Sequence, residues 1–286
     1  MAHLPIIEGF TIGVPDLGAA ISCYETFLEY ERRWEGPAGS LAELWSAPAL
    51  ADAPCAELLP RGAQSGFVRF VQVEATPGYV PFRYPGWNAA EIAVADVDAL
   101  AESLAESPFR TLGPPAELSI SKDIRAMQVE GPGGELLYLT QIKAPIPGFD
   151  LPILERGVGH CFVGIVAGQE GNALKQWYRQ QFQLEPDPPL VDARVQGLSL
   201  AFDLDRETRH PICALPLASG YLVEIDQMPA ADDRPTVAGV PAGIISMSFS
   251  VSELPPGSAA VRLPGSDASA AKVVGASGEW LELVTQ

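Results

Sequence analysis

The sequence contains few basic residues and very few histidines. Its 286 residues include 18 Lys and Arg against 36 Asp and Glu, with only 3 His, and the formal net charge is −18. Acidic residues exceed basic ones in both halves of the chain, so no charged tail is indicated. Nucleic acids and anionic membranes are bound through clusters of Lys and Arg. We therefore expect no nucleic acid and no membrane as partner, whereas a cationic or neutral small molecule is compatible with the charge.

Cysteine is also scarce, and long apolar runs are missing. Cys23, Cys55, Cys161 and Cys213 are far apart and form no C-x-x-C pair, which disfavours a disulfide framework or a structural zinc site. We expect all four to be small buried apolar residues. No apolar run approaches the roughly 18–20 residues that span a bilayer, and the first five residues lack the features of a signal peptide. The sequence predicts a cytoplasmic protein.

What the sequence does contain is one pattern that occurs four times, at a spacing of roughly 70 residues. Residues 6–14 alternate as a half-buried strand does, and Asp16 is placed to cap a helix over residues 17–29. Three strand-like segments follow that helix. The same order begins again near residues 88, 157 and 242.

The later copies differ from the first in detail. Asp96 is placed to cap a helix over residues 97–107, and residues 172–182 have helical spacing. In the fourth copy Pro255-Pro256-Gly257 falls where the helix belongs, so we expect that helix to be nearly lost. Residues 41–47 are predicted to be an inserted helical turn. Residues 183–207 are predicted to be irregular.

A single unit has a sheet with one helix-covered face and must pair with another unit to bury the other face. The sequence therefore predicts an α+β fold in which four βαβββ modules pair into two domains with cupped mixed sheets. The predicted boundaries are 1–143 for the first domain, 144–155 for a proline-rich linker and 156–286 for the second domain. Modules could pair within each half or across halves. Pairing within each half is the working hypothesis.

Four short segments resemble a known superfamily. They are F-T-I-G-V-P-D-L-G at residues 10–18, H-C-F-V-G-I-V at 160–166, and the turns G-P-G-G-E-L-L-Y-L at 131–139 and G-A-S-G-E-W-L-E-L at 275–283. Together they are similar to the vicinal oxygen chelate superfamily, which includes glyoxalase I, bleomycin-resistance proteins and extradiol dioxygenases. The resemblance implies a cupped sheet around a cavity. It also implies a divalent metal held on the first and fourth strands of each module.

The resemblance places His160, Glu224, Ser246 and Glu282 at the ligand positions of the second half. One imidazole and two carboxylates form a reasonable set for Fe(II), Mn(II), Zn(II) or Ni(II). We therefore predict a metal site at His160, Glu224 and Glu282. Ser246 replaces a fourth ligand, which makes ring cleavage the less expected reaction. A glutamate, or His210 with its ordinary pKa near 6.5, would act as acid or base, although a loop position for His210 is also open.

The same positions in the first half hold Gly9, Arg69, Ala89 and Tyr138. These residues do not suit a metal, and an arginine would repel one, so we expect the first domain to have lost its site. Arg69, Glu91 and Tyr138 could instead hold an organic ligand through charged hydrogen bonds. An ion pair between Arg69 and Glu91 is the alternative.

Simpler structural roles remain open for several of these residues. His160 could be a hydrogen-bonded core histidine, and Glu282 could lie on an exposed, frayed end. Glu224 and Asp226 could form a solvated strand edge. Trp280 is either a cavity wall or a core anchor.

The function predicted from the sequence is a divalent-metal-dependent enzyme of the glyoxalase or dioxygenase type, acting on a small organic substrate with vicinal oxygens. The metal would act as a Lewis acid. The alternative is a metal-free protein that binds or sequesters a small molecule, similar to the bleomycin-resistance proteins. A structural or regulatory remnant is a third possibility, and a homodimer is compatible with each.

Overall fold

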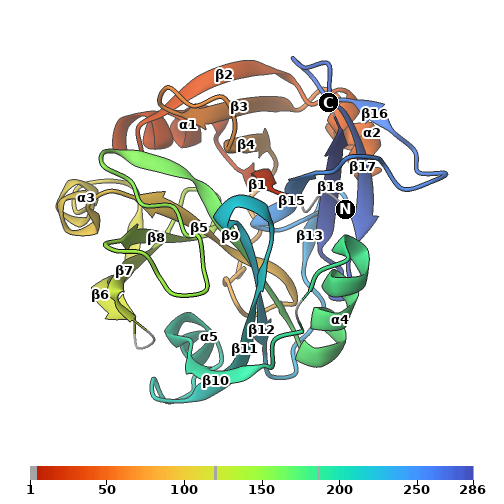
Figure 1. Ribbon diagram of the computed structural model, residues 1–286. Helices are drawn as coiled ribbons and strands as arrows, with labels where there is room; N and C mark the ends of the chain where they lie inside the picture. The colour runs from red at the N-terminus through yellow and green to blue at the C-terminus, as the bar shows by residue number, and fades with distance from the viewer. Residues whose placement is uncertain (1–4, 119–120, 186, 286) are drawn as a thin grey trace.

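A computed structural model describes residues 5–118, 121–185 and 187–285. The four predicted modules are present (Figure 1). The first comprises β1 (Ile7–Val14), α1 (Leu17–Phe27), β2 (Tyr30–Pro37), β3 (Pro54–Pro60) and β4 (Phe67–Gln72). The second comprises β5 (Gly86–Val94), α3 (Val97–Leu104), β6 (Arg110–Leu118), β7 (Ser121–Glu130) and β8 (Leu136–Ile142).

The second half of the chain repeats this order. The third module comprises β9 (Val158–Gly168), α4 (Gly171–Phe182), β10 (Val191–Arg194), β11 (Arg209–Pro216) and β12 (Leu222–Gln227). The fourth comprises β15 (Ile244–Ser250), β16 (Val261–Arg262), β17 (Ser269–Val274) and β18 (Trp280–Thr285). Among the described residues no helix lies between β15 and β16, in agreement with the Pro-Pro-Gly sequence there.

Two helix starts follow the predicted capping. Oδ1 of Asp16 accepts a hydrogen bond of 2.9 Å from the backbone N–H of Ala19. Oδ1 of Asp96 accepts bonds of 3.1 Å and 3.0 Å from Asp98 and Ala99. Each carboxylate satisfies N–H groups that have no partner within the first turn.

The modules pair across the two halves of the chain. The first and fourth form one eight-stranded sheet, sheet A, in the order β16-β17-β18-β15-β1-β4-β3-β2. The second and third form sheet B, in the order β10-β11-β12-β9-β5-β8-β7-β6. The mixed α+β fold with two curled sheets is confirmed, but pairing within each half was the wrong hypothesis. The first strands join antiparallel, β1 to β15 and β5 to β9. The edge of each first strand presents the same backbone N–H and C=O groups, so local sequence does not select its neighbour.

Short inserted helices cover the inner face of each sheet. We define the inner face of sheet A as the one that carries Arg69 and Glu282; α2 (Ser40–Trp45) and η1 (Pro48–Leu50) pack on it. The inner face of sheet B carries Glu91 and Tyr138, and α5 (Gln196–Ala201) lies over it. The helical turn predicted at 41–47 is therefore confirmed. The irregular stretch predicted at 183–207 is wrong in part, because it contains β10 and α5.

The smaller elements are η2 (Ala218–Gly220), β13 (Thr236–Val237) and β14 (Val240–Pro241). All four cysteines are free and buried, as predicted. Within the described ranges, every helix is too short or too polar to cross a membrane.

Candidate functional site

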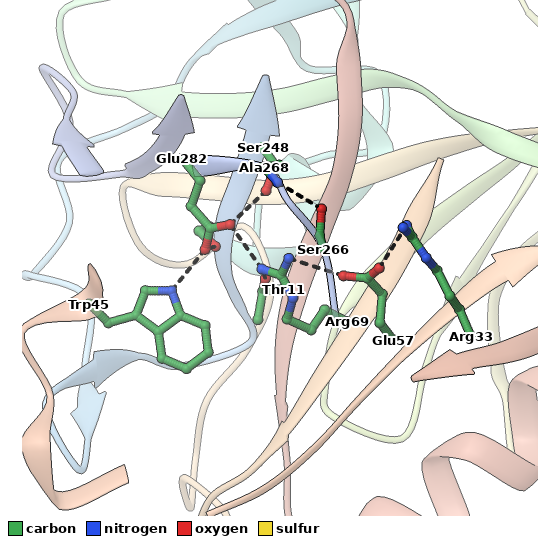
Figure 2. Close-up of polar contacts among 10 residues, drawn as sticks. Thr11, Arg33, Trp45, Glu57, Arg69, Ser248, Ser266, Ala268 and Glu282 are labelled. Atoms are coloured by element: carbon green, nitrogen blue, oxygen red, sulfur yellow. Dashed lines mark hydrogen bonds and ion pairs between the residues drawn. The ribbon is translucent and has the colours of Figure 1, made fainter. Parts of the chain in front are cut away.

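Arg69 and Glu282 form a buried ion pair on the inner face of sheet A (Figure 2). Arg69 lies on β4 and Glu282 on β18, with β1 and β15 between these strands. The Arg69 Nη1 atom is 2.9 Å from Oε2 of Glu282, and Nη2 is 3.1 Å from Oε2 of Glu57 on β3. Arg69 is 1% exposed and Glu282 is 0% exposed. Burial at this depth is costly unless each charge is paired, and here one guanidinium bridges two carboxylates.

Three further donors complete the environment of Glu282. Nε1 of Trp45 donates to Oε1 at 2.8 Å. Ser246 Oγ donates to Oε1, and Ser248 Oγ donates to Oε2, both at 2.7 Å. With Arg69, four donors therefore surround this carboxylate, two on each oxygen.

The charges of the pair support each other. Burial alone would raise the pKa of Glu282, but the Arg69 guanidinium and the three neutral donors outweigh it and hold the pKa below its ordinary value. Burial would lower the pKa of Arg69, and Glu282 and Glu57 reverse that effect, so the pKa lies above its ordinary value. Both groups are therefore ionised at neutral pH.

This arrangement does not fit a divalent metal at Glu282. A metal ligand must offer a free lone pair, and both oxygens of Glu282 already accept two hydrogen bonds. The Arg69 guanidinium places a positive charge beside them, which would repel a cation. Across the described part of the chain, no three His, Cys, Asp or Glu side chains are grouped so as to hold a metal ion.

A cavity of about 730 Å³ opens beside the Arg69–Glu57 pair. Its lining combines apolar side chains with hydroxyl and charged groups. The apolar residues include Ile6, Phe67, Leu263 and Val284, and the polar ones include Glu8, Arg33, Ser65, Ser250, Ser252 and Ser266. The guanidinium of Arg69 lies over the ring of Phe67, with Cζ 4.4 Å from the ring centroid.

The predicted metal ligands do not meet. Glu282 is in sheet A, whereas His160 and Glu224 are in sheet B. His160 packs tightly against Gly66: a side chain at residue 66 would place its Cβ only 2.4 Å from the Cβ of His160. The centroid of the imidazole ring is 5.0 Å from that of the Tyr221 ring. Burial lowers the pKa of His160. The cross-half pairing of modules separates Glu282 from the other two, and within sheet B Glu224 pairs with Ile165, five residues along β9 from His160.

Glu224 lies instead with other acidic groups on the inner face of sheet B. Glu91 of β5 and Tyr138 of β8 are directly paired, and β9 lies between β5 and the β12 strand of Glu224. The alternative of an ion pair between Arg69 and Glu91 is therefore wrong, and the predicted ligand set of Arg69, Glu91 and Tyr138 is divided, because Arg69 belongs to sheet A. Thr140 Oγ1 donates a bond of 2.6 Å to Oε1 of Glu91.

The remaining predicted residues have clear positions. Ser246 is a hydrogen-bond donor to Glu282. Trp280 is partly buried, and the Lys272 ammonium lies over its ring at 4.0 Å from the centroid. His210 is buried in β11, 3.0 Å from Ser199 Oγ; burial lowers its pKa.

Four residues of these two inner faces were not predicted as site residues: Trp45, Glu57, Ser248 and Asp226. Ser248 shares a polar strand face with Ser246, and that alternation was a usable signal. Glu57 and Asp226 likewise alternate with apolar neighbours in their strands. Trp45 gave no such signal, because its partner Glu282 is 237 residues away in the sequence.

Neither a protein-family model nor a curated protein sequence matches the chain. Among solved structures, the chain is similar to glyoxalase I from Zea mays, at 13% identity and a TM-score of 0.62, over 98% of this chain and 92% of that one. It is also similar to a proposed dioxygenase from Bacillus subtilis subsp. subtilis str. 168, at 9% identity and a TM-score of 0.66, over 100% of this chain and 86% of that one. At these identities the likeness establishes the fold and not the activity. The chain has the two-domain vicinal oxygen chelate fold.

Proposed function

We propose that this protein binds a small organic molecule without the help of a metal, in the cavity of sheet A beside Arg69. The observation that carries the proposal is the Arg69–Glu282 pair. It supplies a fixed, buried positive charge on the strand position where the resemblance implied a metal ligand. The pair is complete without a cation from solution, and the cavity beside it is within the size range of small-molecule sites.

The lining indicates the kind of ligand. The apolar lining residues suit a hydrocarbon or aromatic body, and the serine hydroxyls can bind polar substituents. Glu57 is shared by Arg33 and Arg69, and Asp267 is paired with Arg262. Glu8 has no ion pair among the described residues, so the local charge favours a neutral or weakly cationic ligand.

Metal-dependent glyoxalase or dioxygenase chemistry has less support. Its predicted ligands His160, Glu224 and Glu282 lie in two sheets, and Glu282 is fully hydrogen-bonded. Binding is therefore the function that the geometry supports best.

The test is a thermal-shift screen in the presence of a chelator, with neutral and monocationic aromatic compounds, followed by calorimetric titration of each compound that stabilises the protein. Ser65→Trp should block the cavity mouth, because Ser65 is an exposed lining residue. Ser22→Trp is the matched control, because Ser22 is exposed on α1, away from the cavity. We expect Ser65→Trp alone to abolish binding. A screen without any stabilising compound, or equal binding by both variants, would contradict the proposal.

A further inference from the structure

The inner face of sheet B carries three carboxyl groups that have no cation of their own. Glu91 lies on β5, and Glu224 and Asp226 lie two residues apart on the same face of β12. None of them forms an ion pair within the described residues. They are close enough for the charge of Glu224 to add to the effect of burial in raising the pKa of Glu91.

Sheet A shows how this protein neutralises carboxylates at the corresponding place. Arg69 on β4 and Glu224 on β12 are on the fourth strands of the first and third modules, at the same position of the repeat. In sheet A the guanidinium of Arg69 lies between Glu57 and Glu282. In sheet B the corresponding residue is itself acidic, so the positive charge is missing.

Asp226 is the strongest sign that a partner from outside the chain belongs here. Its side chain is 0% exposed, and neither carboxyl oxygen has a hydrogen-bond donor in the described structure. The group that it faces is the carboxyl of Glu224, which can donate a hydrogen bond to it only in the protonated form. Buried polar atoms are nearly always satisfied, so the ionised pair at this depth calls for a cationic donor that no described residue supplies.

The surroundings favour an organic cation over a metal ion. The aromatic ring of Tyr138 lies beside Glu91 and is near both acidic residues of β12. A ring next to carboxylates suits an ammonium or guanidinium group, which gains from the ring face as well as from the charges. The described carboxyl groups are not arranged to hold a metal ion. Glu91, Tyr138 and Glu224 are each partly exposed, so a ligand can reach them from solvent.

We infer that the inner face of sheet B binds the ammonium or guanidinium group of a small organic molecule, with Glu91, Glu224 and Asp226 as counter-charges and Tyr138 as an aromatic wall. This site lies in the other sheet from the proposed cavity beside Arg69. In sheet A the positive charge at this position comes from Arg69, and in sheet B it would come from the ligand.

The probes are benzamidine and phenethylamine, each compared with its neutral counterpart, benzamide or 2-phenylethanol. The titrations use protein that carries Ser65→Trp, so that the cavity in sheet A is blocked, and they should detect binding of the cations only. Loss of one charged partner in Asp226→Asn or Glu224→Gln should weaken binding roughly 10- to 100-fold. Both amide variants keep the size of the side chain and remove a buried charge, so we expect them to fold, as a thermal melt will check. Glu253→Gln, at an exposed position, is the control with the same charge change.

Each outcome decides the inference. Cation binding that is weakened by the two inner-face variants and unchanged in Glu253→Gln supports it. Equal affinity for the neutral counterparts, equal affinity in all three variants, or no binding of either cation overturns it. Because Ser65→Trp blocks only the cavity in sheet A, binding that remains in this variant reports on sheet B, so failure of the cavity in sheet A and failure of this site are distinguishable.

Discussion

The hydroxyl of Tyr24 donates a hydrogen bond of 2.7 Å to Oε1 of Glu135 and so joins helix α1 of the first module to the hairpin turn of the second. Tyr178 and Glu279 repeat this contact at 2.9 Å between the third and fourth modules. The sheets connect modules across the two halves, and these two buried bonds connect modules within each half. Every module is thus fixed to two others, and the duplication is visible in tertiary contacts as well as in the sequence.

Removing one of these hydroxyls should destabilise the protein. Tyr24→Phe leaves Oε1 of the buried Glu135 without its side-chain donor, so we expect the free energy of unfolding to fall by about 1–3 kcal/mol. Tyr178→Phe should have a similar effect through Glu279. Urea unfolding measures both, with Tyr84→Phe as a control at a partly exposed tyrosine. If all three variants unfold alike, the two contacts do not stabilise the fold.

Breaking the central ion pair should cost more. Arg69→Met leaves Glu282 buried without a cation, whereas Glu57 keeps Arg33, so we expect a loss of about 3–5 kcal/mol. Glu282→Gln should be destabilising too, because it leaves the buried guanidinium with Glu57 as its one remaining carboxylate partner among the described residues. The double variant should lose less than the sum of the single losses, since neither charge is then left alone. Additive losses in denaturant unfolding would show that the two side chains do not interact.

Stability should fall as the pH rises from 6.5 to 8. Burial, with the charge of Glu224, raises the pKa of Glu91 to about 8, and burial raises that of Glu135 to about 7. A carboxyl with a raised pKa contributes its full stability below the unfolded-state pKa, and this contribution is lost as the pH rises through the folded-state pKa. For Glu91 the loss over this interval is on the order of 2 kcal/mol.

Histidines do not disturb this measurement. Burial lowers the pKa of His160 and His210, so their contribution is lost only as the pH falls below about 6.5. Urea unfolding at pH 6.5 and pH 8 should therefore show the slope, and Glu91→Gln should make it shallower while Glu135 and Asp226, each with a pKa raised to about 7 by burial, keep part of it. Glu253→Gln should keep the slope of the unmodified protein. A flat profile in the unmodified protein would mean that these carboxyls are not buried as described.

Removal of metal should leave the protein unchanged. Because Arg69 already provides the positive charge beside Glu282, we expect no shift in Tm after dialysis against a chelator and none after reloading with Zn(II) or Mn(II). Elemental analysis should find no stoichiometric metal, and His160→Ala should have the same metal content as the unmodified protein. One bound metal per chain, lost in His160→Ala, would restore the metal-site hypothesis.

Much of this protein was determined by local sequence. Alternation of apolar residues over β1 and the carboxylates of Asp16 and Asp96 act within a few residues, so the strands and helix starts could be predicted without knowledge of the rest of the chain. The same local patterns, repeated four times, identified the modules and the fold. The alternation also placed Ser246 and Ser248 on one strand face.

The partners of each module were decided by the tertiary structure alone. The first strands present the same backbone N–H and C=O groups at their edges, so nothing local distinguishes β15 from β5 as the neighbour of β1. Only the packing of the whole chain selects one pairing. That choice moved Glu282 away from Glu224 and placed it against Arg69 and Trp45, from distant parts of the chain. The sequence determined which residues could carry a site, and the three-dimensional pairing decided which of them meet, because the charge of a buried carboxylate depends on the groups packed against it.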